Sequence, residues 1–395
     1  MKFALIRVGS IALAILGAFA FDTVVKGALD SFAVRLVFLA GLYVTLAVSL
    51  NLINGVTGQF SIGHAAFYQV GAYAAAYLSI NYFAGQSLSA PVWIIAMLVV
   101  GAIMASLAGL IVGLPSLRLR GDYLAIATLG FGEIIRIVVQ NTQELGAARG
   151  LSVSPKVEAP LWLAVLLATV CIAVCRNLLK VAHGLTFLAV RDDEVASSAM
   201  GINVTKTKVV AFLVGSAFAG SAGALMAHNS GFIEPNMFTM ETSFVILTMV
   251  VLGGTGSITG ATIAAIVLSI LPEALRLIDA VTMSGLIGAT ISLIGTVVVL
   301  RHVGEHFHGK ASQKAARIAG TLVGAVVVTY VLKFLLGLIP ALASASVEGS
   351  KLRLVIFAAT LIMVMLLRPQ GVFAHHEFSW NWVRGLFRKT SEARA

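Results

Sequence analysis

The chain has 395 residues, of which 59% are hydrophobic and only 11% are charged. Soluble domains carry roughly 25% charged residues, so this composition excludes an ordinary soluble protein. A helix that spans a bilayer needs ~20 mostly apolar residues, and the chain offers about ten such stretches. The sequence therefore predicts an all-α, polytopic integral membrane protein with about ten transmembrane helices, built as a single transmembrane domain over residues 1–395.

The net charge of +10 would suggest nucleic-acid binding in a soluble protein. Here the basic residues gather in loops, where they indicate membrane orientation instead. Loops 114–122 and 176–208 carry several Arg and Lys residues, whereas loops 81–90 and 228–241 carry none. Because basic loops stay in the cytoplasm, the N-terminus is expected there too, and no nucleic-acid partner is expected.

The first apolar run follows Lys2 and Arg7 and ends in Ala18-Phe19-Ala20, which also fits a cleaved signal peptide. We favour a retained first helix over that alternative. In chain order, the expected membrane helices fall at about 3–21, 34–53, 62–80, 91–113, 123–140, 159–178, 207–227, 242–271 (interrupted), 281–300, 316–340 and 353–367.

A polar interruption, NLINGVTGQFSIGHAAF at 51–67, follows the second run. Its glycines and amides favour a helix break on a polar pathway, because irregular backbone at membrane depth is tolerated where it lines a cavity. A polar turn between two crossings is the alternative. No partner ligand lies at helical spacing from His64, so no metal site is predicted. The candidate pathway residues here are Asn54, Gly58, Gln59, Ser61, Gly63 and His64.

In the run at 123–140, Glu133 and Arg136 are three residues apart and can pair on one helix face. Charges inside a membrane are costly and often functional. We interpret these two residues as a structural ion pair that fixes helix packing, with direct substrate contact as the alternative.

The segment RDDEVASSAMGINVTKTK, residues 191–208, is charged but lies between two apolar runs. Asp192, Asp193 and Glu194 suit the start of a helix, because negative charge there complements the helix dipole. Gly201 suits the end of that helix as a C-terminal cap. The sequence predicts a short helix under the membrane that another protein could hold, with a solvated loop without a partner as the alternative.

The run 242–271 is interrupted by GGTGS at 253–257, which leaves two pieces that are short for a crossing. The basic loop 301–317 and the basic C-terminal tail fall inside only if this broken segment enters and returns on one side. We therefore predict a broken or re-entrant helix pair and two cytoplasmic termini. The candidate pathway residues at this hinge are Gly253, Gly254 and Gly256.

The three histidines of HVGEHFHGK, residues 302–310, do not follow a familiar zinc spacing and are interpreted as part of an interfacial loop. No Walker A, HExxH, CxxC or Ser-His-Asp arrangement stands out. The chain is expected to be a transporter and not an enzyme, with no metal and no cofactor.

Several motifs occur in one order: GQFSIGHAAF, LPSLRLRGDYLAIATLGFGEIIR, AVRDDEVASSAMGINVTKTKVVAF, MVVLGGTGSITGA and MLLRPQGVF. Together they resemble the permease subunit of branched-chain amino-acid ABC importers, over roughly 34–276 and 351–373. The resemblance implies a multi-pass protein of the bacterial inner membrane, surrounded by membrane lipid. Its implied partners are two cytoplasmic ABC ATPase subunits, a second related permease subunit and a periplasmic substrate-binding protein.

In that family a cytoplasmic loop couples the permease to the ATPase, and the resemblance places this coupling loop at 191–205. Glu194 and Gly201 are seven residues apart, one more than is common in the family. Segment 277–350 also departs from the family, because two extra apolar runs form an additional hairpin. The implied ATPase-coupling residues are Arg191, Asp192, Asp193, Glu194 and Gly201.

The expected function is the transfer of branched-chain or related amino acids from the binding protein into the cytoplasm. Similar permeases move urea or short amides, so an ABC permease for those solutes is one alternative. An ion-coupled secondary transporter that works without an ATPase is another, and Glu133 is the main membrane-embedded acid available to it.

Overall fold

The computed structural model describes residues 2–82, 89–116, 121–153 and 159–276, together with 281–282, 328, 346–347 and 371. The chain divides into two compact units, residues 1–269 with 372–395 and residues 270–371. Apart from isolated positions, the predicted helices at 281–300, 316–340 and 353–367 and the histidine loop 302–310 lie outside the described residues.

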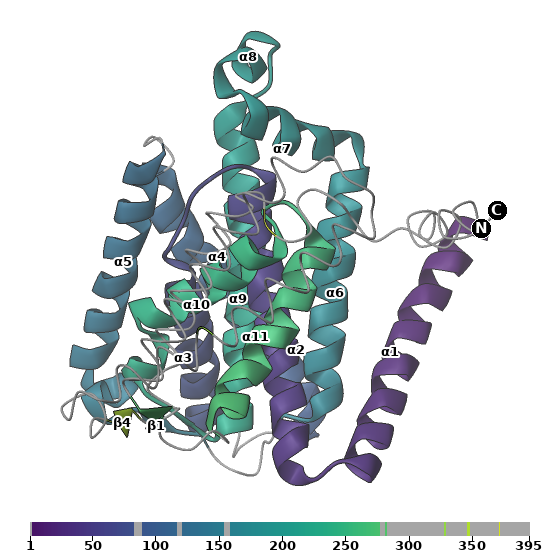
Figure 1. Ribbon diagram of the computed structural model, residues 1–395, viewed down its shortest axis with the longest axis vertical. Coiled ribbons are helices and arrows are strands. Elements are labelled where there is room, and N and C mark those ends of the chain that lie inside the picture. Colours follow the sequence, from purple (N-terminus) through teal and green to yellow (C-terminus); the bar gives the residue numbers. More distant parts are fainter. Residues whose placement is uncertain are drawn as a thin grey trace. The chain divides into compact units, whose positions relative to one another are not determined.

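Helices dominate the described ranges (Figure 1). The α-helices are α1 (Lys2–Ala28), α2 (Ser31–Asn51), α3 (His64–Tyr82), α4 (Ala90–Ser116), α5 (Asp122–Asn141), α6 (Leu161–Lys180), α7 (Ala182–Asp192), α8 (Glu194–Ala199), α9 (Val204–Ser230), α10 (Met240–Gly253) and α11 (Ile258–Arg276). Shorter turns are the π-helix η1 (Leu52–Val56) and the 3-10 helices η3 (Gln143–Leu145), η4 (Ala147–Arg149) and η6 (Pro235–Phe238).

Six helical segments of the described residues are long and apolar enough to cross a membrane. They confirm an all-α, polytopic membrane protein, and the expected number of ten crossings stays a prediction. The six segments are 31–56, 90–115, 123–141, 161–180, 204–230 and 235–253.

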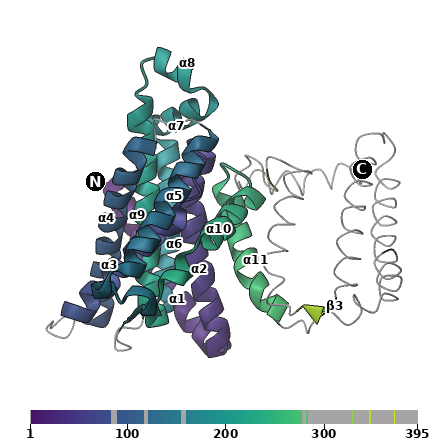
Figure 2. The same cartoon turned by 90° about the vertical axis from the view of Figure 1, so that its left-hand side faces the viewer.

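Helix α9 forms much of the core of the first unit, where it packs against α2, α3 and α4 (Figures 1 and 2). Small residues allow this close approach. A Cβ on Gly220 would overlap the carbonyl of Gly101 in α4, and a Cβ on Gly71 in α3 would overlap the carbonyl of Gly220. The run AFAGSAGALMA of α9 is therefore a packing surface for two neighbouring helices.

The strands are two residues long and tie loops together. In the first unit, β1 (Leu151–Ser152) pairs antiparallel with β2 (Phe232–Ile233), which joins the loop after α5 to the loop after α9. In the second unit, β3 (Val281–Thr282) pairs antiparallel with β4 (Ser346–Val347). This second pairing brings the two ends of the predicted extra hairpin, 277–350, side by side.

The interruption at GGTGS separates α10 from α11, as the sequence predicts. Gly254 has φ 117° and Gly256 has φ 93°, a backbone conformation that favours glycine. A Cβ on Gly253 would overlap the backbone of Gly260, so the chain turns back sharply between the two helices. With 14 residues, α10 is about 21 Å long. By itself it is therefore shorter than the hydrocarbon core of a bilayer, and only together with η6 does it form the 19-residue segment 235–253 counted above.

A close-packed glycine and an open one provide a test of the packing around α9. In Gly220→Ala the new methyl group meets Gly101 and Ala105, and overpacking costs roughly 1–3 kcal/mol. Nothing lies within 4 Å of a Cβ on Gly130 in α5, so Gly130→Ala gains about 1 kcal/mol of helix propensity. In detergent, the melting temperature of Gly220→Ala should be lower than that of the parent chain, and that of Gly130→Ala should be equal or higher. The reverse order would contradict this packing.

Candidate functional site

The charged segment that the sequence singles out, 191–208, covers the end of α7, all of α8 and the start of α9, at one end of the first unit (Figure 1). Asp193 is the N-cap of α8, and its carboxylate accepts hydrogen bonds from the backbone N–H groups of Val195 (2.8 Å) and Ala196 (3.0 Å). Asp192 is the last residue of α7 instead of part of a helix start, because Asp193 has an extended backbone that ends α7 before α8 begins. The predicted short helix is α8, and it begins two residues after Asp192.

Helix α8 ends as the sequence predicts. Gly201 has φ 84°, its N–H bonds to the carbonyl of Ser198 (3.0 Å), and the N–H of Ile202 bonds to the carbonyl of Ser197 (3.0 Å). This pair of bonds is a Schellman cap. Two apolar side chains at this short helix are exposed, Val195 by 65% and Met200 by 83%.

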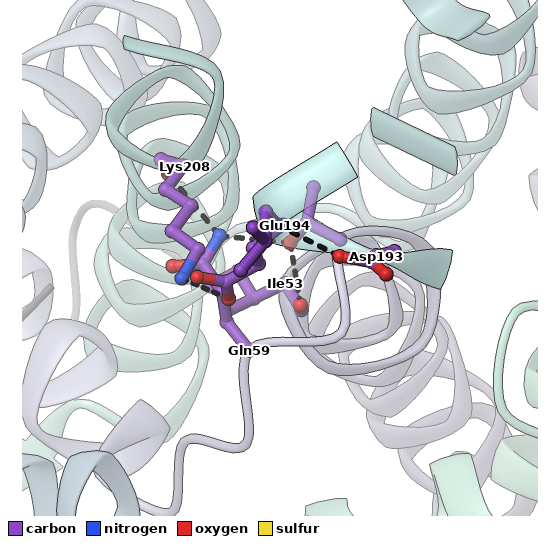
Figure 3. Close-up of polar contacts among 7 residues, drawn as sticks. Ile53, Gln59, Asp193, Glu194 and Lys208 are labelled. Carbon is purple, nitrogen blue, oxygen red and sulfur yellow. Dashed lines mark hydrogen bonds and ion pairs between the residues drawn. The ribbon is translucent and has the colours of Figure 1, made fainter. Parts of the chain in front are cut away.

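The base of α8 is fixed to α9 by an ion pair between Glu194 and Lys208 (Figure 3). The residue Lys208 is only 4% exposed. A buried ammonium group is costly unless a carboxylate pairs with it, so this contact holds α8 against the start of α9. The two residues are 14 positions apart, and no local spacing in the sequence pointed to Lys208.

The helix break after α2 contacts the same region. The side-chain amide of Gln59 donates to the hydroxyl of Thr57 (2.8 Å) and, at 3.4 Å, to the backbone carbonyl of Lys208 (Figure 3). The guanidinium group of Arg191 donates to the carbonyl of Gly55 (3.4 Å). The turn between α7 and α8 therefore contacts the break directly, through Arg191, and indirectly, through Lys208.

The break itself consists of the π-helix Leu52–Val56 and an irregular stretch, 57–63, that leads to His64. Asn54 holds the two sides together, because its amide donates to the carbonyl of Ser61 (3.0 Å) and its oxygen accepts from the N–H of Ser61 (3.2 Å). Gln59 and Ser61 are buried. A Cβ on Gly63 would overlap the carbonyl of Thr128, so α5 packs directly on this backbone.

The two breaks pack against each other. The side-chain oxygen of Asn51 accepts a hydrogen bond from the N–H of Gly256 (2.8 Å). A Cβ on Gly55 would overlap both of these partners. The segments around 54–63 and 253–257 are far apart in the sequence, and Asn51, which joins them, is not among the predicted site residues.

His64 is buried, and one of its two ring nitrogens is bonded. Its Nε2 atom lies 2.9 Å from the hydroxyl of Ser49, and its ring packs edge-on against Phe67 at 6.2 Å. Among the residues that the structure describes, no group of three His, Cys, Asp or Glu residues could hold a metal ion.

Glu133 and Arg136 of α5 pair as the spacing predicts, with 2.8 Å between Oε2 and Nε. Arg136 also donates to Gln140 (3.4 Å). The side chain of Glu133 borders a small cavity of about 10 Å³ that is also lined by Gly63, Ala65 and Ser243. Such a cavity has room for about one water molecule. It lies where the first break, α5 and α10 meet.

A multi-pass helical bundle with buried helix breaks joined to an exposed, capped helix has the architecture of a membrane permease. The chain belongs to the family described as the branched-chain amino acid transport system / permease component, whose model matches residues 32–295. It is 35% identical over 269 residues to the high-affinity branched-chain amino acid transport system permease protein LivM of Escherichia coli (strain K12). That alignment covers 60% of this chain and 61% of LivM.

Two more distant relatives are similar. The probable branched-chain amino acid transport permease protein LivM of Methanocaldococcus jannaschii is 28% identical over 254 residues, 55% of this chain and 73% of that protein. The permease protein LivH of Salmonella typhimurium is 24% identical over 255 residues, 59% of this chain and 82% of LivH. These relatives are permease subunits and not enzymes. No solved structure matches the chain.

The cap of α8 can be tested with two neighbouring aspartates. Asp193→Ala removes both capping hydrogen bonds, which costs about 1 kcal/mol and should fray α8. Asp192→Ala removes an exposed ion pair with Arg191, which contributes little. Amide hydrogen exchange should therefore speed up over 194–200 by about fivefold in Asp193→Ala and hardly change in Asp192→Ala. Equal exchange in the two variants would contradict the capping role.

Proposed function

We propose that the chain is the permease subunit of an ABC importer that moves branched-chain or related amino acids into the cytoplasm. Its partners would be two cytoplasmic ABC ATPase subunits, a second related permease subunit and a periplasmic substrate-binding protein. The membrane would be the bacterial inner membrane, with both chain termini in the cytoplasm. Membership of the family and the names of the relatives support this proposal.

The observation that carries the proposal is the exposed surface of α8. Val195 and Met200 present apolar side chains there, beside the charged residues Asp192 and Asp193. The positive-inside rule supports a cytoplasmic location for this end of the bundle, where lipid would not cover these side chains. A rigid, capped helix with an exposed apolar surface fits a groove on a partner protein. The coupling role of Arg191, Asp192, Asp193, Glu194 and Gly201 belongs to this proposal.

The contacts of α8 provide a route for its movement. A push on α8 acts on α9 through Glu194 and Lys208, and on the first break through Arg191 and the carbonyl of Gly55. The first break acts in turn on the second through Asn51 and Gly256. ATP binding can drive this change only if the ATPase binds the two conformations with different affinity.

The two breaks are the proposed liners of the substrate pathway, because non-helical backbone at membrane depth lies where protein or a water-filled cavity covers it. The proposed liners are Asn54, Gly58, Gln59, Ser61, Gly63, His64, Gly253, Gly254 and Gly256. An ion-coupled carrier working alone is less well supported, because Glu133, the acid that it would use, is paired with Arg136.

Reconstitution tests the proposal as a whole. The chain should co-purify with a second permease and an ATPase, and uptake of labelled leucine into proteoliposomes should require ATP and a loaded binding protein. Uptake without any ATPase would show an ion-coupled carrier instead. Uptake of urea or acetamide in preference to leucine would show the amide-transporting alternative.

A matched pair of arginine variants tests the coupling route. Arg191→Ala removes the charge-assisted bond to Gly55, which is worth about 1.5–3 kcal/mol, so leucine uptake should fall roughly tenfold or more. Arg176→Ala removes an equal charge from an exposed position of α6 and should leave uptake unchanged. Both variants should still co-purify with the ATPase. Uptake that falls equally in the two variants would indicate a general charge effect and would contradict the route.

A further inference from the structure

Two polar side chains inside α3 are buried without a hydrogen-bond partner among the residues that the structure describes. Gln69 is 0% exposed, and neither its Oε1 nor its Nε2 atom is bonded. Tyr73 is 3% exposed, and its hydroxyl is also unbonded. Buried polar groups are nearly always hydrogen-bonded, because leaving one unpaired costs the desolvation of that group. Two such residues one helical turn apart therefore need an explanation.

Both side chains belong to one face of α3. Residues 65, 69 and 73 are four positions apart, which places them one above another on the helix. The end of this row nearest the N-terminus of α3 is called its inner end, and the end at Tyr73 its outer end. At the inner end, the N–H of Ala65 donates to the hydroxyl of Ser243 in α10 (3.1 Å). At the outer end, the ring of Tyr73 lies 6.1 Å from that of Phe238 in η6. Gln69 lies between Ala65 and Tyr73 on this face of the helix.

The row connects features at both of its ends. Its inner end, at Ala65 and Ser243, borders the small cavity beside Glu133. Its outer end lies beside Phe238 of η6, and Glu234 directly precedes η6 in the loop after β2. A series of polar groups therefore runs from the loop after β2, along α3, to the first helix break. Phe238 supplies an apolar wall beside the polar atoms, because its ring packs edge-on against both Tyr68 and Tyr73.

We propose that Gln69 and Tyr73 bind the ammonium and carboxylate groups of a zwitterionic amino acid as it passes from the outer face to the helix break. The amide of Gln69 both accepts and donates hydrogen bonds, and the hydroxyl of Tyr73 donates one. A zwitterion offers a donor and an acceptor on neighbouring atoms. The apolar side chain of the amino acid would lie against Phe238. This inference rests on the proposed function, since it assumes that an amino acid crosses this chain.

The two groups are unpaired in this conformation because the passing substrate supplies their hydrogen bonds only while it is bound. If these groups were bonded permanently to other protein groups, they could not form hydrogen bonds with the substrate. Two apolar residues of the same size would pack here without this desolvation penalty, but they could not bind a zwitterion.

The test is a pair of near-isosteric variants, Gln69→Met and Tyr73→Phe, in the assembled importer. If the groups serve the substrate, each variant should melt at a higher temperature than the parent chain, because it removes an unpaired buried group. At the same time, the ratio of leucine transported to ATP hydrolysed should fall about tenfold, as expected for one lost hydrogen bond to a charged group. Tyr73→Phe retains the ring contact with Phe238. A lower transport ratio in this variant would therefore be due to the missing hydroxyl alone.

Ser79→Ala is the matched control on the same helix. The hydroxyl of Ser79 is buried but fully engaged, because it bonds to His228 (2.8 Å) and accepts from the indole N–H of Trp93 (2.9 Å). Its removal should lower the melting temperature and leave the ratio of leucine to ATP unchanged.

Four outcomes separate the possibilities. Higher melting temperatures with a lower transport ratio in both variants would support the site. Lower melting temperatures with an unchanged ratio would overturn it and would indicate structural partners, such as buried water or another segment. An unchanged ratio in Gln69→Met while the parent chain transports leucine would overturn this inference alone. Failure of the parent chain to transport leucine would instead contradict the proposed function.

Discussion

The structure depends on one constraint: backbone groups that leave a helix inside a membrane must find partners within the protein. The chain between α2 and α3 unwinds at 57–63, and its groups cannot be left facing lipid, where each would cost several kcal/mol. Their partners come from elsewhere in the bundle. Thr128 of α5 accepts from the N–H of Ile62 (3.2 Å), and Ser243 of α10 accepts from the N–H of Ala65 (3.1 Å).

This pairing makes the break a junction between helices. Asn51 reaches the second break at Gly256, and Arg191 reaches the carbonyl of Gly55 from the turn between α7 and α8. Each of these side chains bonds to a backbone group at a helix break. A displacement of one element must therefore either move the break or leave a polar group unpaired. The same contacts that stabilise the bundle can in this way transmit a movement across it.

Two kinds of interior surface follow from this arrangement. Around α9 the helices meet through glycine and alanine, with backbones so close that no larger side chain fits. Along α3 the interior surface includes the polar side chains of Gln69 and Tyr73. Neither has a hydrogen-bond partner among the described residues. The first surface is suited to a fixed contact, and the second to one that changes when a solute passes.

Sequence alone located most of the helices, because a membrane helix needs a long apolar run and such runs are visible without any structure. It also located both breaks, through their glycines and amides, and the cap at Gly201. It placed Asp192 in the wrong helix, since the point at which α7 ends depends on the backbone of Asp193 and not on composition. The helix α7 itself was missed, because its mixed sequence lacks a distinctive periodic signal.

The sequence by itself therefore determined that the chain lies in a membrane, which segments form its apolar helices and where those helices are interrupted. All three follow from the local cost of placing polar groups in lipid. Only the tertiary structure decided which groups, distant in the sequence, pair with one another near those interruptions. Lys208 pairs with Glu194, Asn51 with Gly256 and Ser243 with Ala65, over separations of 14, 205 and 178 residues. Such pairings depend on how the helices pack, and packing against small residues is decided by the fit of whole surfaces instead of by any local pattern.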